Sequence, residues 1–125
     1  ALGKGMFTGT VTADTRFADG DIRARVPRFN PENLAANEAL VEHVAQLARR
    51  KGATTGQIAL AWLLAQQPWI VPIPGTRRIE RIRENAAAVT VGLSADELAD
   101  LNALTTTVGV HGDRYNAQHM GYVNR

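Results

Sequence analysis

The chain has no cysteine among its 125 residues. Disulfide scaffolds, thiolate metal sites and cysteine nucleophiles are therefore excluded. Its longest apolar run, residues 58–65, is much shorter than the ~20 residues that a transmembrane helix needs. The three histidines show no metal-ligand spacing, and the only serine, Ser94, stands where it would cap a helix. We therefore expect no metal site, and we assign no catalytic residue within this chain.

An excess of one charge sign is also missing, because 14 basic and 12 acidic residues leave a net charge of +2. This small excess does not indicate nucleic acid, and we expect neither a nucleic acid nor a membrane as a partner. Hydrophobic residues make up 45% and charged residues 21% of the chain, which excludes a disordered or collagen-like protein. The chain begins at Ala1 without a signal-peptide pattern, and we expect it to be a piece of a longer protein.

Residues 1–30 are rich in turns, and no apolar period persists among them. Small and charged residues alternate from Asp14 to Arg25, as is typical of an exposed loop. A loop of this length is unusual within a domain and is often functional. Both a lid over a site and a floppy insertion fit the pattern.

Two helices are predicted over residues 31–67 from the spacing of their apolar residues. Asn30 can cap the first helix, and Gly52 can take the left-handed position that ends it. Thr54 and Gln57 have the spacing of a capping box at the start of the second helix.

The period then changes to a short apolar, β-branched run at residues 69–74, which predicts a buried strand. Helical spacing resumes over 76–88, with Ile79 and Ile82 facing the core, and residues 94–125 form a terminal helix and tail. Alternating strands and helices indicate an α/β protein with parallel strands. Because two strands cannot form a stable parallel sheet, the chain is structurally incomplete.

The most informative segment is 76–85, which contains four arginines and two glutamates. It follows the predicted strand, where the first turn of a helix attracts an anion. Spacings of three and four residues place several polar side chains on one helix face: Arg77, Arg78, Arg81, Glu84 and Asn85. Arginine matches phosphate oxygens, and an amide can hydrogen-bond to adenine, so this face suits a phosphorylated nucleotide. An exposed helix with ordinary Arg–Glu pairs is the alternative.

A weaker signal lies in the glycine-rich opening, residues 2–9. Its backbone N–H groups could approach a pyrophosphate, with Lys4 nearby. The segment has neither the P-loop ending nor the dinucleotide fingerprint.

Three segments together resemble the aldo-keto reductase family: Leu2-Gly3-Lys4-Gly5-x-x-Thr8-Gly9, then Thr55-Gly56-Gln57-Ile58-Ala59-Leu60-Ala61-Trp62, and then Ile73-Pro74-Gly75-Thr76 with Arg81, Glu84 and Asn85. The resemblance covers nearly the whole chain and weakens in the long loop and the tail. The Gly-Thr-Arg form at residues 75–77 is closer to the bacterial and plant branches than to the vertebrate ones.

The resemblance implies a (β/α)8 TIM barrel, of which residues 1–125 would be the C-terminal segment. Strand 7 and a long loop would occupy 1–30, strand 8 would occupy 69–74, and the cofactor helix would occupy 76–88. The last two β/α units, the terminal helix and the tail would then be present. A full barrel needs about 250 residues, so half or more would be missing here. The resemblance places the family's catalytic Asp, Tyr, Lys and His on earlier strands, and no position in this chain matches them.

By resemblance, the cofactor is NADP. Leu2, Gly3, Lys4 and Gly5 would hold its pyrophosphate. Thr76 and Arg81 would hold the 2′-phosphate with Arg77 as a helper, and Glu84 and Asn85 would bind adenine. Gly75 would lie at the same site, where some branches have a lysine.

The complete protein would then be a cytoplasmic oxidoreductase that reduces an aldehyde or ketone with NADPH, while this segment alone would be inactive. Two alternatives stay open: a non-catalytic nucleotide-binding or regulatory module, and a truncated barrel fragment that self-associates. If the complete protein is an oxidoreductase, the implied partners are NADP(H), a carbonyl substrate and the N-terminal remainder of the barrel.

Overall fold

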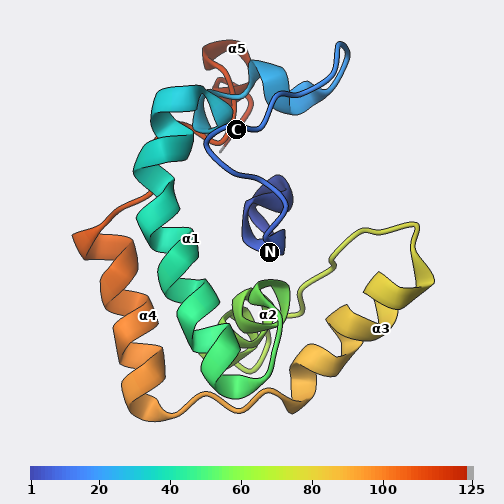
Figure 1. Cartoon of the computed structure of the whole chain (residues 1–125), viewed down its shortest axis with the longest axis vertical. Helices are drawn as coiled ribbons and strands as arrows, with labels where there is room; N and C mark the ends of the chain where they lie inside the picture. The colour runs from blue at the N-terminus through green and yellow to red at the C-terminus, as the bar shows by residue number, and fades with distance from the viewer. Residues whose placement is uncertain (124–125) are drawn as a thin grey trace.

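The computed structural model describes residues 1–123 of the chain and is built of helices (Figure 1). The body consists of α1 (Pro31–Lys51), α2 (Thr55–Gln66) and α4 (Ala95–Thr107), while α3 (Ile79–Ala87) projects beside α2. The tail carries a single turn, α5 (Ala117–Met120). Four short 3-10 helices complete the fold: η1 (Gly3–Thr8), η2 (Ile22–Arg25), η3 (Pro27–Phe29) and η4 (Ala88–Thr90).

The ends of the body helices follow the local sequence signals. Thr54 and Ser94 both form the predicted capping boxes, which satisfy the first N–H groups of α2 and α4. Gly52 ends α1 in the left-handed region at φ 60°. Asn30 stands at the start of α1 but makes no side-chain capping bond.

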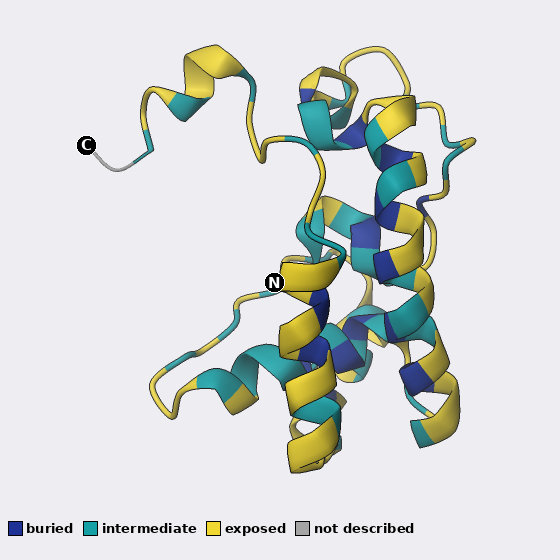
Figure 2. Ribbon diagram, turned by 90° about the vertical axis from the view of Figure 1, so that its left-hand side faces the viewer, coloured by how far each residue is buried: buried dark blue, intermediate teal, exposed yellow. Residues whose placement is uncertain are grey.

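The main core lies where the three body helices meet, and Figure 2 shows their buried segments facing one another. Val44 and Leu47 of α1 pack there with Ile58 of α2 and Leu101 of α4. The indole Nε1 of Trp62 donates to a side-chain oxygen on α4 at 2.8 Å, which joins α2 and α4 at the edge of this core. Burial of these aliphatic side chains supplies the main stabilisation of the body.

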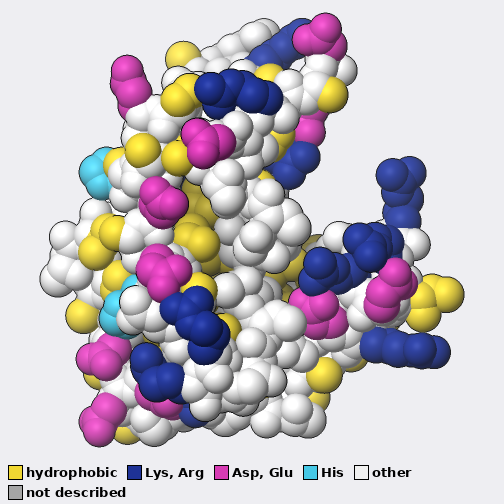
Figure 3. All heavy atoms as spheres, in the orientation of Figure 1, with side chains coloured by type: hydrophobic (Ala, Val, Ile, Leu, Met, Phe, Trp, Pro, Cys, Tyr) yellow, Lys and Arg dark blue, Asp and Glu magenta, His cyan; other side chains and the backbone are white. Residues whose placement is uncertain are grey.

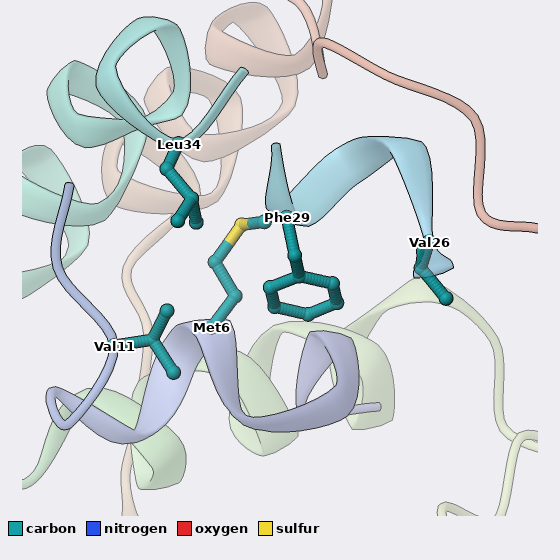
Figure 4. Close-up of a cluster of buried hydrophobic side chains, with 5 residues drawn as sticks. All are labelled: Met6, Val11, Val26, Phe29 and Leu34. Carbon is teal, nitrogen blue, oxygen red and sulfur yellow. The ribbon is translucent and has the colours of Figure 1, made fainter. Parts of the chain in front are cut away.

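A second core orders the long loop. Five buried side chains form it, and Figure 4 shows Met6 extending between Phe29 and Leu34: Met6, Val11, Val26, Phe29 and Leu34. Phe17 packs edge-on against Phe29 with ring centroids 5.4 Å apart. The loop is therefore a packed element that joins the opening turn to the start of α1, and the interpretation as a floppy insertion is wrong.

Neither of the two predicted strands is formed, and residues 1–123 contain no strand at all. The opening folds as η1, and residues 70–74 run without helix or ladder hydrogen bonds after a turn at Pro68 and Trp69. Val71 and Ile73 are 79% and 90% exposed, and Ile79 and Ile82, expected to face the core, are also exposed. A parallel strand needs neighbours on both sides and cover on both faces, and this chain supplies neither. The α/β architecture is therefore not visible in the chain by itself.

Within residues 1–123, no helix combines the length and hydropathy needed to span a bilayer.

Candidate functional site

A pocket of about 250 Å³ lies between the opening turn, the start of α2 and the approach to α3. Ten residues line it: Leu2, Thr8, Thr10, Gly56, Gly75, Thr76, Arg78, Arg81, Glu84 and Asn85. Six of them are among the ten predicted cofactor-binding residues: Leu2, Gly75, Thr76, Arg81, Glu84 and Asn85. The structure therefore brings five of the six predicted residues of segment 75–85 together with Leu2, one of the four predicted residues of the opening.

The start of α3 decides which arginines reach this pocket. Thr76 Oγ1 accepts the backbone N–H of Arg78 at 3.2 Å, and the Arg78 carbonyl accepts the N–H groups of Arg81 and Ile82, both at 3.1 Å. The helix begins at Ile79, three residues later than predicted, because residues 76–78 form this capping turn. Both Arg77 and Arg78 precede the helix, but only Arg78, its N-cap residue, lines the pocket.

Within the pocket, Arg81 and Glu84 form an ion pair. Arg81 Nη1 donates to both carboxylate oxygens of Glu84, at 3.0 and 2.7 Å. Thr54 Oγ1 donates to Glu84 Oε1 at 2.9 Å, and Gln57 Nε2 donates to the Glu84 backbone carbonyl at 2.9 Å. The capping box of α2 therefore holds α3 in place and orients the pocket's carboxylate.

Basic side chains gather along α3, with acidic ones between them (Figure 3). The Arg78 guanidinium lies 3.3 Å from Glu80, and both side chains are exposed. The pKa of Glu80 lies below its usual value, first because its own backbone N–H and then because Arg78 hydrogen-bonds to the carboxylate. Such exposed pairs contribute little stability.

Gly56 is a pocket residue whose role the sequence did not indicate. A Cβ added to this buried residue would lie 3.6 Å from Leu2 Cδ2 and 3.8 Å from Glu84 Oε1. These are ordinary contact distances, so a side chain would fit but would take up pocket space. The sequence carried no specific signal for this role, since a glycine in the first turn of a helix is compatible with many functions.

The remaining predicted residues, Gly3, Lys4 and Gly5, lie outside the pocket lining. Gly3 and Gly5 have φ angles of 59° and 99°, and the Gly5 N–H donates to the Leu2 carbonyl at 3.0 Å. The opening is therefore a tight turn that needs glycine at these positions. The Lys4 side chain leads away to the C-terminal tail, where its amine donates to the Arg114 carbonyl.

A larger pocket of about 620 Å³ lies on the other side of this turn. Lys4 lies at its edge, residues 20–26 form one wall, and residues 115–123 of the tail form the other. Across residues 1–123, no three His, Asp or Glu side chains come together as metal ligands.

The amino-acid sequence matches a known protein family. Residues 1–106 match the Aldo/keto reductase family. The chain therefore belongs to the aldo/keto reductase family. It is 39% identical over 114 residues to the "Aldo-keto reductase yakc [NADP(+)]" of Schizosaccharomyces pombe, covering 91% of this chain and 34% of that protein. It is 34% identical over 113 residues to the aldo-keto reductase str7 of Strobilurus tenacellus, covering 90% of this chain and 34% of that protein.

The chain spans about a third of the length of the curated relatives that it matches. Membership of the family implies that the chain is part of a TIM barrel, although residues 1–123 form no strand. Both relatives are fungal, so they do not confirm the bacterial or plant branch that the sequence suggested.

Proposed function

We propose that this chain is the NADP-binding C-terminal part of an oxidoreductase that reduces aldehydes or ketones with NADPH. The observation that carries the proposal is the pocket in which Thr76, Arg81, Glu84 and Asn85 meet the opening turn at Leu2. Family membership and the NADP(+) in the printed name of the S. pombe relative support it.

The residues of this pocket fit the phosphorylated end of such a cofactor. Arg78 and Arg81 offer guanidinium groups, and Thr76 offers a hydroxyl group for a 2′-phosphate. Glu84 and Asn85 offer an acceptor and an amide for the polar edge of adenine. At about 250 Å³, the pocket is smaller than the roughly 300–1,000 Å³ that encloses a drug-sized ligand, so it would hold one end of the dinucleotide.

The contacts of Glu84 prepare the site before the cofactor arrives. Thr54 and Arg81 together hold its carboxylate, so the carboxylate has little freedom to lose when a ligand binds. Gly56 and Gly75 leave the wall open, because neither places a side chain in the pocket. Gly3 and Gly5 would let the backbone of the opening turn approach the pyrophosphate. Lys4 and Arg77 are not included in this site.

The N-terminal remainder of the barrel would cover the exposed apolar surface of the chain. Val71, Ile73, Ile79 and Ile82 present this surface along residues 70–74 and α3, and beside them lies an apolar pocket of about 320 Å³. In the complete barrel, residues 69–74 would gain strand partners, and the catalytic residues would come from the missing part. When bound, the nicotinamide supplies the hydride. Self-association of the fragment through the same surface is the alternative. We also propose that the complete oxidoreductase is cytoplasmic.

Arg81→Ala in the full-length protein tests the nucleotide site. A charge-assisted contact to a phosphate is worth about 1.5–3 kcal/mol, so NADPH binding should weaken roughly ten- to a hundredfold while NADH binding stays nearly unchanged. Arg83→Ala is the matched control, because Arg83 is on the same helix but does not line the pocket. Fluorescence titration of both cofactors gives the affinities, and carbonyl-dependent oxidation of NADPH tests the reaction. Equal losses for both cofactors would contradict the phosphate role of Arg81.

A further inference from the structure

The C-terminal tail is fastened to the chain at two places after α4 ends. The first is Asn37 of α1, which is only 1% exposed. Its amide donates to the His111 carbonyl at 2.9 Å, and its side-chain oxygen accepts the His111 N–H at 2.9 Å. Arg28 Nε adds a bond to the Gly112 carbonyl at 3.1 Å. A buried amide with both ends satisfied by one backbone residue holds the tail in a single register.

The second fastening is Lys4. Its amine donates to the Arg114 carbonyl and lies 4.0 Å from the centroid of the Tyr115 ring. We call Lys4, the Arg114 carbonyl and the Tyr115 ring the tail clasp. Lys4 and Arg114 are 110 positions apart, so no local pattern in the sequence connects them.

The backbone of the opening turn aims Lys4 at the tail. Lys4 is the only non-glycine residue in the described part of the chain with a positive φ, at 55°. Gly3 and Gly5 flank it and also have positive φ angles. A positive φ costs energy for any residue with a Cβ, so surrounding contacts must hold Lys4 in this backbone conformation.

The clasp lies at the edge of the pocket of about 620 Å³. Asp21 and Arg23 stiffen one wall through an ion pair at 2.7 Å, and Arg23 also lies 4.6 Å from the Phe17 ring centroid. Tyr115 and His119 belong to the opposite wall, which is the tail itself. The width of this pocket therefore depends on where the tail is held.

We propose that Lys4 is a positioning residue that fixes the C-terminal tail as a wall of this pocket, and that it is not a ligand of the cofactor phosphates. The carbonyl and the ring hold the amine at the tail, and Lys4 does not line the nucleotide pocket. Leu2 of the same turn lines the nucleotide pocket, so one short turn supports both pockets through different residues. The proposal is independent of the proposed function, since it concerns contacts within this chain.

The rate of trypsin cleavage tests the clasp directly, because trypsin cleaves after Arg114, the residue whose carbonyl accepts the Lys4 hydrogen bond. In the full-length protein, Lys4→Met should speed cleavage at bond 114–115 roughly five- to twentyfold, because loss of the cation removes both contacts. Lys4→Arg keeps a cation and should restore slow cleavage. Cleavage after Arg16, which has no contact with the clasp, is the internal control and should not change.

The tyrosine supplies an independent pair of variants. Tyr115→Phe keeps the ring and should behave like the parent protein, whereas Tyr115→Leu should speed cleavage as Lys4→Met does. The affinity of Lys4→Met for NADPH and for 2′,5′-ADP should equal that of the parent. Unchanged cleavage in both Lys4→Met and Tyr115→Leu would overturn the clasp. A loss of nucleotide affinity in Lys4→Met would overturn the second part of the proposal, that Lys4 is not a ligand of the cofactor phosphates.

Discussion

The Thr54 hydroxyl connects the capping box of α2 to Glu84 on α3. It accepts the backbone N–H of Gln57 at 3.2 Å and donates to Glu84 Oε1 at 2.9 Å. One oxygen therefore caps the N-terminus of α2 and also orients a carboxylate of the proposed nucleotide pocket. Stability and site geometry depend on the same atom.

Thr54→Ala should lower the free energy of unfolding by about 1–2 kcal/mol, since an N-cap side chain is lost and Glu84 loses a donor. It should also weaken binding of 2′,5′-ADP, because the carboxylate is no longer held. Denaturant unfolding and ligand titration of the full-length protein measure the two effects. Thr54→Ser keeps the hydroxyl and should retain most of both properties. Equal behaviour of the alanine and serine variants would show that the hydroxyl has no such double role.

Features encoded within a few residues could be predicted from the sequence. The capping boxes at Thr54 and Ser94 and the left-handed Gly52 were predicted and are observed, because each depends only on neighbouring residues. The polar face of the α3 helix was predicted in the same way, and Arg81, Glu84 and Asn85 do share one pocket. Helical spacing sufficed for these three because all of them lie within the helix.

Features that depend on distant residues could not be predicted. The bonds from Asn37 to His111 span 74 positions, and no local pattern marks Asn37 as a buried polar residue. Lys4 was placed with the phosphates because it stands in a glycine-rich turn, but the direction of its side chain depends on the tail. The strand predicted at 69–74 fails for a similar reason, since strand pairing needs partners that this chain does not contain.

Acid should weaken the contact between α1 and α4 through Glu97. Its carboxylate pairs with the Lys51 amine at 2.8 Å and accepts a hydrogen bond from the Ser94 N–H at 2.8 Å. These bonds, the one from Lys51 first, lower the pKa of Glu97 below its usual value of 4.5. Because the unfolded chain then binds the proton more readily, the stabilisation is present above pH 4.5 and is lost as the pH falls through the lower folded value.

Glu97→Gln should therefore reduce stability at neutral pH and flatten its decline as the pH falls below 4.5, as measured by thermal unfolding. Lys51→Met should produce much of the same change, and the double variant should lose less than the sum of the two. Additive losses would mean that the two side chains do not act as a pair.

The last prediction separates two neighbouring arginines. Arg78 lines the nucleotide pocket, and Thr76 holds its backbone N–H at 3.2 Å. Arg77 has the same charge but lies outside the lining. Arg78→Ala in the full-length protein should weaken NADPH binding by roughly three- to tenfold and leave NADH nearly unchanged, since an exposed guanidinium contributes less than a buried one.

Arg77→Ala is the matched control and should change neither affinity by more than about twofold, because its charge acts only through screened solvent. Glu80→Gln should strengthen NADPH binding slightly, since the Arg78 guanidinium loses the anion that lies 3.3 Å away. Titration of the three variants with both cofactors at one ionic strength gives the comparison. A larger loss for Arg77→Ala than for Arg78→Ala would restore the role that the sequence assigned to Arg77. It would also mean that the approach to α3 rearranges when the nucleotide binds.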